Sequence, residues 1–124
     1  MTPPVRVVIV EDNDTFRETL ELLFGMRDEV EVVATVSTGD EASEVCAAVS
    51  PDVVLMDYRM PGLNGAEATR AVLGACPRTR VVCLTASVTP QEVEEVRAAG
   101  AVALVTKDED FDRLVAAVCE AAAA

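Results

Sequence analysis

Five short runs rich in valine and other β-branched residues constrain the fold of this chain more than any other feature. Three of them are almost continuously apolar and lack the inside–outside alternation of a strand that has one wet face. Such runs are typical of strands that are covered on both sides of a parallel sheet. Another run, which carries Glu31 and Thr35 among its valines, predicts a partly exposed edge strand. The predicted strands cover residues 5–10, 30–36, 53–56, 81–84 and 102–106.

Helical patterns fill the intervals between these strands. Phe16, Leu20 and Phe24 lie on one stripe of an amphipathic helix, and a last helix over about residues 110–122 carries a similar stripe. Each interval has room for one strand, one helix and two turns, which predicts five successive βα units. Right-handed crossovers would then place helices on both faces of a five-stranded parallel sheet.

Capping residues mark the expected helix starts. Thr15 and Thr38 each precede a glutamate by three residues, which is the spacing of a capping box. The helix that follows Thr38 is expected to end near residues 49–51. Thr89 stands before a proline at the first helical position and an acid at the third, and Gly100 marks the expected end of that helix. The last helix is expected to be capped within residues 108–110.

Length and charge exclude several classes of function. The chain has 124 residues and no visible linker or repeat, so one domain over residues 1–124 is expected. Its net charge of −12 predicts repulsion from DNA and from anionic membranes, because both require a basic patch. The lack of histidine removes the commonest general base and the usual zinc ligand. No apolar run reaches the roughly 18 residues that are needed to span a bilayer.

The cysteines favour a reducing environment. They stand at positions 46, 76, 83 and 119, form no C-x-x-C pair and have apolar flanks. Buried thiols in the cytoplasm are therefore expected in preference to disulfides or a metal cluster.

Acidic side chains follow neighbouring strands at the edge where a parallel sheet binds its ligands. Glu11 and Asp12 follow the first predicted strand, Asp57 the third, Thr85 the fourth and Lys107 the fifth. Three carboxylates in one pocket require cations, since two charges about 4 Å apart repel by on the order of 4 kcal/mol at an effective dielectric of 20. Lys107, the only lysine of the chain, supplies one positive charge. The remaining deficit and the oxygen-only donors predict a bound Mg²⁺ or Mn²⁺.

These motifs, in this order, resemble the response-regulator receiver domain of two-component signalling over essentially the whole chain. The resemblance is carried by Glu11-Asp12, by Asp57 followed by Tyr-Arg-Met-Pro-Gly, by Thr85-Ala86 and by Lys107. The loop up to Gly65, Ala68-Thr-Arg70 and Gly100-Ala101 further resemble the NarL/LuxR-type subfamily. The resemblance implies a flavodoxin-like (βα)5 doubly wound sheet with strand order 2-1-3-4-5.

The same resemblance implies the role of each site residue. Asp57 is expected to accept a phosphoryl group from a histidine kinase. Glu11 (mainly through water), Asp12, Asp57 and the backbone carbonyl of Arg59 are expected to bind Mg²⁺. Lys107 is expected to pair with Asp57 and afterwards with a phosphoryl oxygen.

Two further positions are implied to form the switch that follows phosphorylation. The Thr85 hydroxyl is expected to turn toward the phosphoryl group, for which Ala86 leaves room. Where the family usually places an aromatic residue three positions before the lysine, this chain has Leu104. Leucine has neither a ring nor a hydroxyl with which to transmit phosphorylation to the face formed by the fourth helix, fifth strand and fifth helix, the face through which a receiver domain is expected to act.

Other interpretations of these residues remain open. Asp57 and the Glu11-Asp12 pair also suit turns, and Lys107 also suits a lysine extended along the surface. One alternative function is a phosphorylation-independent binding module, which Leu104 favours. A metal-dependent small-molecule phosphatase is another, less favoured because Arg59 stands where such enzymes often carry a second acid.

The expected partners follow from the resemblance. They are a histidine kinase, a second copy of the chain in a homodimer, and an output domain that regulates transcription and lies outside these residues. Direct binding of this domain to nucleic acid or to a membrane is not expected, and any catalysis is expected to be confined to its own phosphorylation and dephosphorylation.

Overall fold

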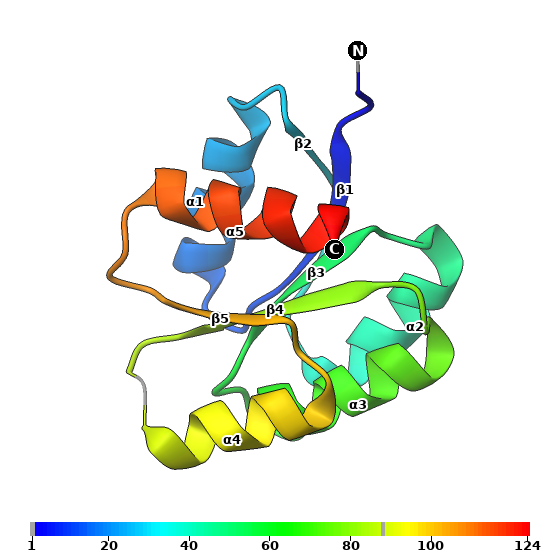
Figure 1. The fold of residues 1–124 in the computed structure, drawn as a ribbon, viewed down its shortest axis with the longest axis vertical. Helices are drawn as coiled ribbons and strands as arrows, with labels where there is room; N and C mark the ends of the chain where they lie inside the picture. The colour runs from blue at the N-terminus through cyan, green and yellow to red at the C-terminus, as the bar shows by residue number, and fades with distance from the viewer. Residues whose placement is uncertain (1, 88) are drawn as a thin grey trace.

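Five parallel strands form one sheet at the centre of the computed structural model, which describes residues 2–87 and 89–124 (Figure 1). The order of the strands across the sheet is β2-β1-β3-β4-β5. This topology confirms the predicted doubly wound (βα)5 fold. The strands are β1 (Val5–Val10), β2 (Val30–Val36), β3 (Val53–Asp57), β4 (Arg80–Thr85) and β5 (Ala103–Thr106).

Helices cover both faces of the sheet, as Figure 1 shows. Helices α1 and α5 lie on one face, and α2, α3 and α4 lie on the other. Each helix connects two strands by a crossover, which is why the strands run parallel. The helices are α1 (Asp14–Gly25), α2 (Gly39–Val49), α3 (Gly65–Ala75), α4 (Pro90–Ala99) and α5 (Phe111–Ala123).

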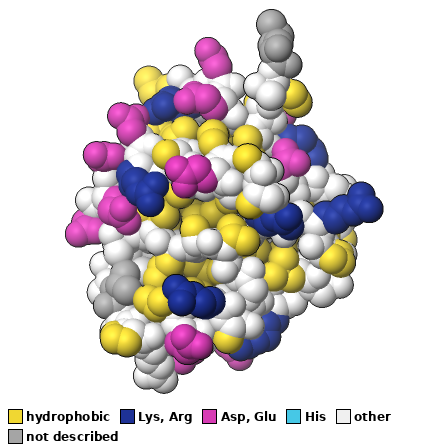
Figure 2. All heavy atoms as spheres, in the orientation of Figure 1, with side chains coloured by type: hydrophobic (Ala, Val, Ile, Leu, Met, Phe, Trp, Pro, Cys, Tyr) yellow, Lys and Arg dark blue, Asp and Glu magenta, His cyan; other side chains and the backbone are white. Residues whose placement is uncertain are grey.

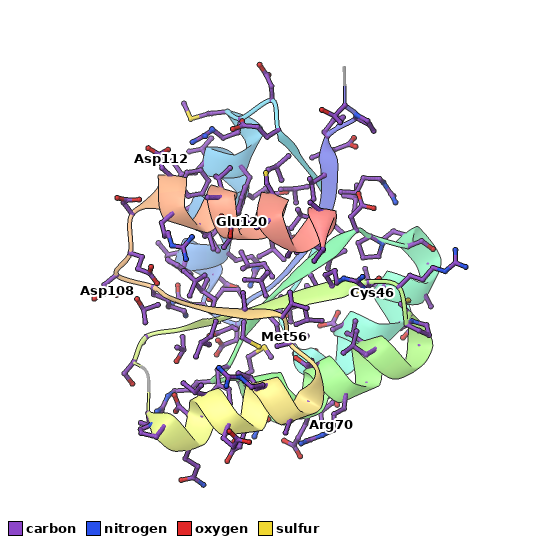
Figure 3. The ribbon with its side chains drawn as sticks, viewed as in Figure 1. Cys46, Met56, Arg70, Asp108, Asp112 and Glu120 are labelled. Atoms are coloured by element: carbon purple, nitrogen blue, oxygen red, sulfur yellow. The ribbon has the colours of Figure 1, made fainter. Side chains whose placement is uncertain are left out.

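The burial of the strands explains their sequence pattern. All five residues of β3 are buried, because this strand lies in the middle of the sheet with helices above and below it. Strand β2 lies at an edge and is only partly buried between its ends, as its mixed sequence predicts. Alternate residues of the strands face two separate apolar clusters, one beneath α1 and α5 and one above α2, α3 and α4. Figure 3 shows Met56 in the interior between these layers, whereas Asp108, Asp112 and Glu120 lie at the surface.

The structure corrects several predicted boundaries. Strand β3 includes Asp57, β4 runs from Arg80 to Thr85, and β5 begins at Ala103, one residue later than predicted. Asp57 and Thr85 are therefore the last residues of paired strands, so the sheet itself fixes the backbone from which their side chains project.

The predicted start of α1 is also wrong. Asn13 caps this helix by accepting a hydrogen bond from the Phe16 amide at 2.8 Å, and Thr15 lies inside the helix. Asparagine is as good a cap as threonine, so the local pattern did not decide between them. The caps at Thr38 and Thr89, and the helix end at Gly100, are as predicted.

Two of the four cysteines differ from expectation. Cys46 and Cys83 are buried, but Cys76 and Cys119 are partly exposed. All four are free thiols. Burial raises the pKa of Cys46 to about 12 and that of Cys83 to about 11, which keeps both protonated near neutral pH.

The surface in Figure 2 has an uneven distribution of side chains. Most of the Asp and Glu side chains on this face lie over its upper left, and apolar side chains show in the band between α5 and α4. Val102, directly before β5, is 48% exposed. Within the part of the chain that the structure describes, we found no helix with the length and apolar character that crossing a membrane requires.

Candidate functional site

Three carboxylates meet at the carboxyl end of the sheet. The register pairs Val10 of β1 with Met56 of β3, so the residues that follow them, Glu11 and Asp57, end side by side. Glu11, Asp12 and Asp57 each offer a carboxylate oxygen within 4.8 Å of the others. The Glu11 and Asp57 side chains are only 2% and 3% exposed, whereas Asp12 is exposed. The pocket thus has two buried acids at its base and one at its mouth.

Lys107 reaches this pocket from the end of β5. Its Nζ lies 2.8 Å from Glu11 Oε1 and 3.3 Å from Asp57 Oδ1, so the shorter contact is with Glu11 rather than with the expected partner. The amide of Lys107 donates to the Thr85 carbonyl at 2.7 Å, which ties the lysine to β4. The ammonium also lies 4.7 Å from the centre of the Phe16 ring, a distance suited to a cation–π contact. The lysine is therefore held from three sides.

Burial and charge shift the acid–base equilibria of the pocket. Desolvation, and then hydrogen bonding and repulsion from Glu11, raise the pKa of Asp57, Lys107 opposes them, and the net result is a pKa of about 8. Burial tends to lower the pKa of Lys107, but Glu11 and Asp57 outweigh it, and the net shift is upward. Lys107 stays charged at neutral pH, and Asp57 resists ionisation until more positive charge is present.

The donor set fits a hard divalent cation. Asp57 Oδ2 is buried and has no hydrogen-bond partner among residues 2–87 and 89–124. An orphaned, desolvated carboxylate oxygen costs free energy unless a cation or donor approaches it. The surrounding ligands are carboxylate oxygens with one exposed member, a combination suited to Mg²⁺ or Mn²⁺ with bound water. The pocket therefore has both the donors and the charge deficit for such an ion.

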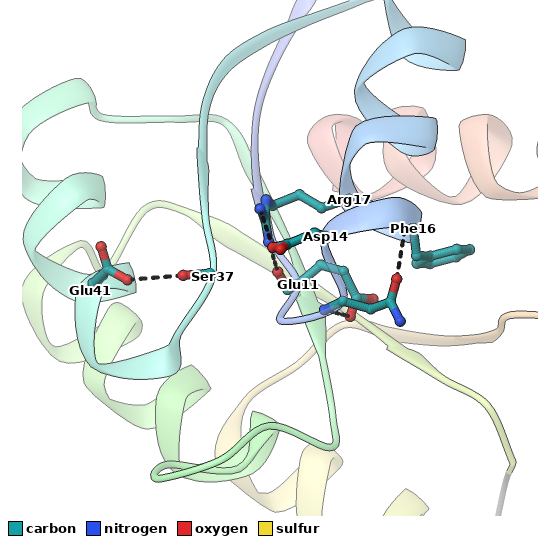
Figure 4. Close-up of polar contacts among 7 residues, drawn as sticks. Glu11, Asp14, Phe16, Arg17, Ser37 and Glu41 are labelled. Atoms are coloured by element: carbon teal, nitrogen blue, oxygen red, sulfur yellow. Dashed lines mark hydrogen bonds and ion pairs between the residues drawn. The ribbon is translucent and has the colours of Figure 1, made fainter.

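The start of α1 holds Glu11 in place, as Figure 4 shows. The Asn13 amide donates to Glu11 Oε2 at 3.1 Å, and Arg17 Nη1 donates to the Glu11 carbonyl at 2.8 Å. Arg17 is itself paired with Asp14 at 2.7 Å. The sequence pattern alone does not reveal Asn13 and Arg17 as site residues, because their contribution depends on the chain folding back over Glu11. The apolar stripe of α1 likewise predicts packing for Phe16 but not its contact with Lys107.

Gly65 fixes the path of the loop between Asp57 and α3. A Cβ at this position would lie 2.7 Å from Tyr58 Cα and 2.8 Å from the Asp57 carbonyl oxygen. The Gly65 amide donates to the Tyr58 carbonyl at 2.7 Å. Asn64 and Glu67 form a capping box that completes the start of α3. The loop therefore returns tightly onto the residue that follows Asp57.

Thr85 and Leu104 occupy the strands beside Asp57. Thr85 is buried at the end of β4, and its hydroxyl donates to the Ser87 carbonyl at 2.8 Å. Ala86, the next residue, is exposed. Leu104 is partly buried on β5 and packs toward α4, where a cavity of about 60 Å³ lies between it and Val93. The structure thus brings the Thr85 backbone to the pocket but leaves Leu104 on the α4 side of the sheet.

The two residues that follow Asp57 contact α4 through their side chains. The Tyr58 hydroxyl donates a hydrogen bond to Glu95, and Arg59 Nη2 lies 2.6 Å from Glu92 Oε1. In the sequence, Glu92 is recognisable only as an acid at the start of a helix. The helix pattern alone could not reveal these contacts, since they depend on how α4 lies against the loop.

Comparisons with known proteins agree on one family. The family model described as "Response regulator receiver domain" matches residues 7–119. The chain is 37% identical over 114 residues to the transcriptional regulatory protein LnrK of Bacillus subtilis, covering 92% of this chain and 52% of that protein. It is 36% identical over 118 residues to the probable transcriptional regulatory protein NarL of Mycobacterium tuberculosis, covering 95% of this chain and 55% of the relative.

The solved structures agree with the sequence comparisons. The signal receiver domain of the putative response regulator NarL from Mycobacterium tuberculosis superposes with a TM-score of 0.92 at 35% identity, covering 98% of both chains. The chain spans about half the length of the curated relatives that it matches.

Proposed function

Because the chain belongs to the response regulator receiver domain family, and within it to the NarL/LuxR type, we propose that Asp57 receives a phosphoryl group from a histidine kinase. The observation that carries this assignment is the Asp57 carboxylate itself. It is buried at the end of the central strand, lies beside Lys107, and has one oxygen without a partner among the described residues. A residue that only shaped a turn would not need a buried, unpaired carboxylate oxygen, which destabilises the fold.

The chemistry assigned to Asp57 is an in-line substitution at phosphorus. A carboxylate oxygen forms a bond to the phosphorus of a phosphohistidine, the P–N bond breaks, and the imidazole nitrogen of the donor keeps the electron pair. Phosphoryl transfer depends mainly on alignment and on neutralising the phosphoryl oxygens. Histidine is absent from this chain and is not required, because the donor supplies it.

The other pocket residues provide charge and position. Glu11, Asp12 and Asp57, with the backbone carbonyl of Arg59, would hold Mg²⁺, which supplies positive charge that offsets the carboxylates and the incoming phosphoryl oxygens. Lys107 holds a second positive charge against Asp57 Oδ1. Thr85 would exchange its hydrogen bond to the Ser87 carbonyl for one to a phosphoryl oxygen. That exchange is a local event that biases the nearby surface.

The proposal also defines what the domain does with its partners. We assign its chemistry to its own phosphorylation and dephosphorylation, since Arg59 rather than an acid stands two residues after Asp57. All of residues 1–124 would act as one receiver domain, which the match over residues 7–119 supports. An output domain would lie in the remainder of the whole protein, and the relatives named as transcriptional regulators favour an effect on transcription. A second copy of the chain is a further candidate partner.

Phosphorylation of the isolated chain tests the proposal. With a small phosphodonor and Mg²⁺, we expect a mass increase of one phosphoryl group that maps to Asp57, and no increase with a chelator. The Asp57→Asn variant should remain unmodified, whereas Asp52→Asn, a change near the opposite end of β3, should behave as wild type. An unmodified wild-type chain in excess donor and Mg²⁺ would refute the assignment.

A phosphorylation-independent binding module is the second candidate, and Leu104 is the residue that favours it. This position lacks an aromatic ring, and the space beside Leu104 is a cavity of only about 60 Å³. Equal partner affinity and equal oligomeric state with and without beryllofluoride, a phosphoryl mimic, would support this second function.

A further inference from the structure

Two adjacent residues tie the segment after Asp57 to one helix. Tyr58 donates to Glu95, and Arg59 pairs with Glu92 at 2.6 Å. Glu92 and Glu95 are three residues apart on α4, so they lie on neighbouring turns of one helix face. These side chains, from Tyr58 and Arg59 on one side and from Glu92 and Glu95 on the other, form a double tether. The two contacts connect consecutive residues of the loop to one face of α4.

The Glu92 contact differs from an ordinary surface ion pair. The Glu92 side chain is only 9% exposed, although that of Arg59 is 63% exposed. Glu92 Oε2 is buried without a hydrogen-bond partner in the described parts of the chain. The Glu92 amide is fixed by the Thr89 cap at 3.1 Å, so the acid begins from a rigid helix start. A buried carboxylate with one satisfied oxygen depends strongly on the cation that satisfies it.

We propose that Glu92 and Glu95 are positioning residues that couple occupancy of the Asp57 pocket to the position of α4. The inference rests on the proposed function, in which the Arg59 backbone carbonyl is a ligand of the divalent ion. An ion that binds this carbonyl fixes its position, and thereby also fixes the position of the Tyr58–Arg59 segment. The double tether transmits the same requirement to α4.

The tether supplies a route that Leu104 does not. Tyr58 is the only tyrosine of the chain, and it lies directly after Asp57 on the loop rather than on β5. Its ring packs against the apolar cluster between the sheet and helices α2, α3 and α4, and its hydroxyl reaches Glu95. Coupling between two sites is reciprocal, so a change in α4 must alter ion affinity as much as the ion alters α4.

The first test measures the affinity of the unphosphorylated chain for Mg²⁺. The emission of Tyr58 provides the signal, because the chain has one tyrosine and no tryptophan, and calorimetry provides a second readout. We expect Glu92→Gln and Glu95→Gln each to weaken Mg²⁺ binding, and the double variant to weaken it by about fivefold or more, the lower end of typical site-to-site coupling. Glu94→Gln is the matched control, since Glu94 lies exposed on the same helix and makes no side-chain hydrogen bond within the described residues.

The second test reads the coupling in the opposite direction. Beryllofluoride with Mg²⁺ should change amide hydrogen exchange across α4 in the wild type and in Glu94→Gln, and this change should be lost in the double variant. A role limited to stability would raise exchange in α4 without changing Mg²⁺ affinity. That result, or Mg²⁺ affinity within twofold of wild type in the double variant, would overturn the inference.

The outcomes separate this inference from the proposed function. A wild type that binds Mg²⁺ and is phosphorylated on Asp57, with double-variant affinity unchanged, refutes the tether alone. A wild type that neither binds Mg²⁺ nor accepts a phosphoryl group refutes both. The charge-exchanged double variant Arg59→Glu with Glu92→Arg restores the ion pair between these two positions. A higher Mg²⁺ affinity in this double variant than in Glu92→Arg alone would support the tether.

Discussion

Replacing Asp57 by asparagine should stabilise the fold, by an amount that grows with pH. Burial and Glu11 raise the pKa of Asp57 from 3.8 to about 8. Between these two values, the folded chain holds a proton that the unfolded chain has released. The free energy of unfolding therefore falls as pH rises through this window. The asparagine variant has no such proton and should lose stability more slowly over the same range.

The size of the effect follows from the pKa shift and from the contacts of Lys107. A difference of one bound proton changes the free energy of unfolding by at most about 1.4 kcal/mol per pH unit. The pKa of about 8 already includes the opposing contact of Lys107 with Asp57, and Lys107 keeps its 2.8 Å contact with Glu11 in the variant. The window between 3.8 and about 8 spans roughly four pH units, so we expect the variant to be more stable by about 5 kcal/mol near pH 8, with little difference near pH 4. The melting temperature should rise by about 20 °C at the higher pH.

Urea unfolding of both proteins between about pH 5 and pH 8, in the presence of a chelator, is the appropriate assay. Only the difference between the two stability curves is interpreted, because all titratable groups other than Asp57 are common to both proteins. Added Mg²⁺ should then stabilise the wild type by about 2.7 kcal/mol at a hundred times its dissociation constant and should stabilise the variant less. Parallel stability curves for the two proteins across this pH range would show that Asp57 does not have a raised pKa.

Two substitutions test the backbone around the pocket. Gly65→Ala would place a Cβ 2.7 Å from Tyr58 Cα, so we expect the free energy of unfolding to fall by about 3 kcal/mol. Gly74→Ala, in the same helix, is the control: its Cβ would have nothing within 4 Å, and the free energy of unfolding should rise by about 0.5–1 kcal/mol. A similar loss of stability at both positions in urea unfolding would refute the close contact at Gly65. Asn13→Ala should cost about 1 kcal/mol through loss of the helix cap, while Thr15→Ala should change stability by less than about 0.5 kcal/mol. The reverse order of these two losses would restore the original assignment of the cap.

The strands were the most predictable part of the fold. A short, continuously apolar run such as that of β3 must be covered on both faces, which in a chain of this size is typical of a central strand of a parallel sheet. The edge position of β2 was equally predictable from its mixed sequence. The cap of α1 was not, since Asn13 and Thr15 are both good caps and the choice depends on the hydrogen bond from the Asn13 amide to the Glu11 side chain.

The composition of the pocket was predictable, but its contacts were not. Parallel strands bring their carboxyl ends to one edge, so Glu11, Asp57 and Lys107 had to lie near one another. Which oxygen the lysine approaches depends on side-chain reach and packing, here including the Phe16 ring. The contact of Arg59 with α4 depends on tertiary packing, and no periodicity within one helix encodes it.

The central position of β3 determines where a response to phosphorylation must appear. Strand β3 is paired with β1 up to Met56 on one side and with β4 up to Asp57 on the other. A new group on the Asp57 carboxylate is therefore attached to a rigid strand, since displacing the end of β3 would disturb its pairing with both neighbouring strands. Movement has to occur in the segments held by only a few contacts, and the sheet should look the same in the resting and the modified protein.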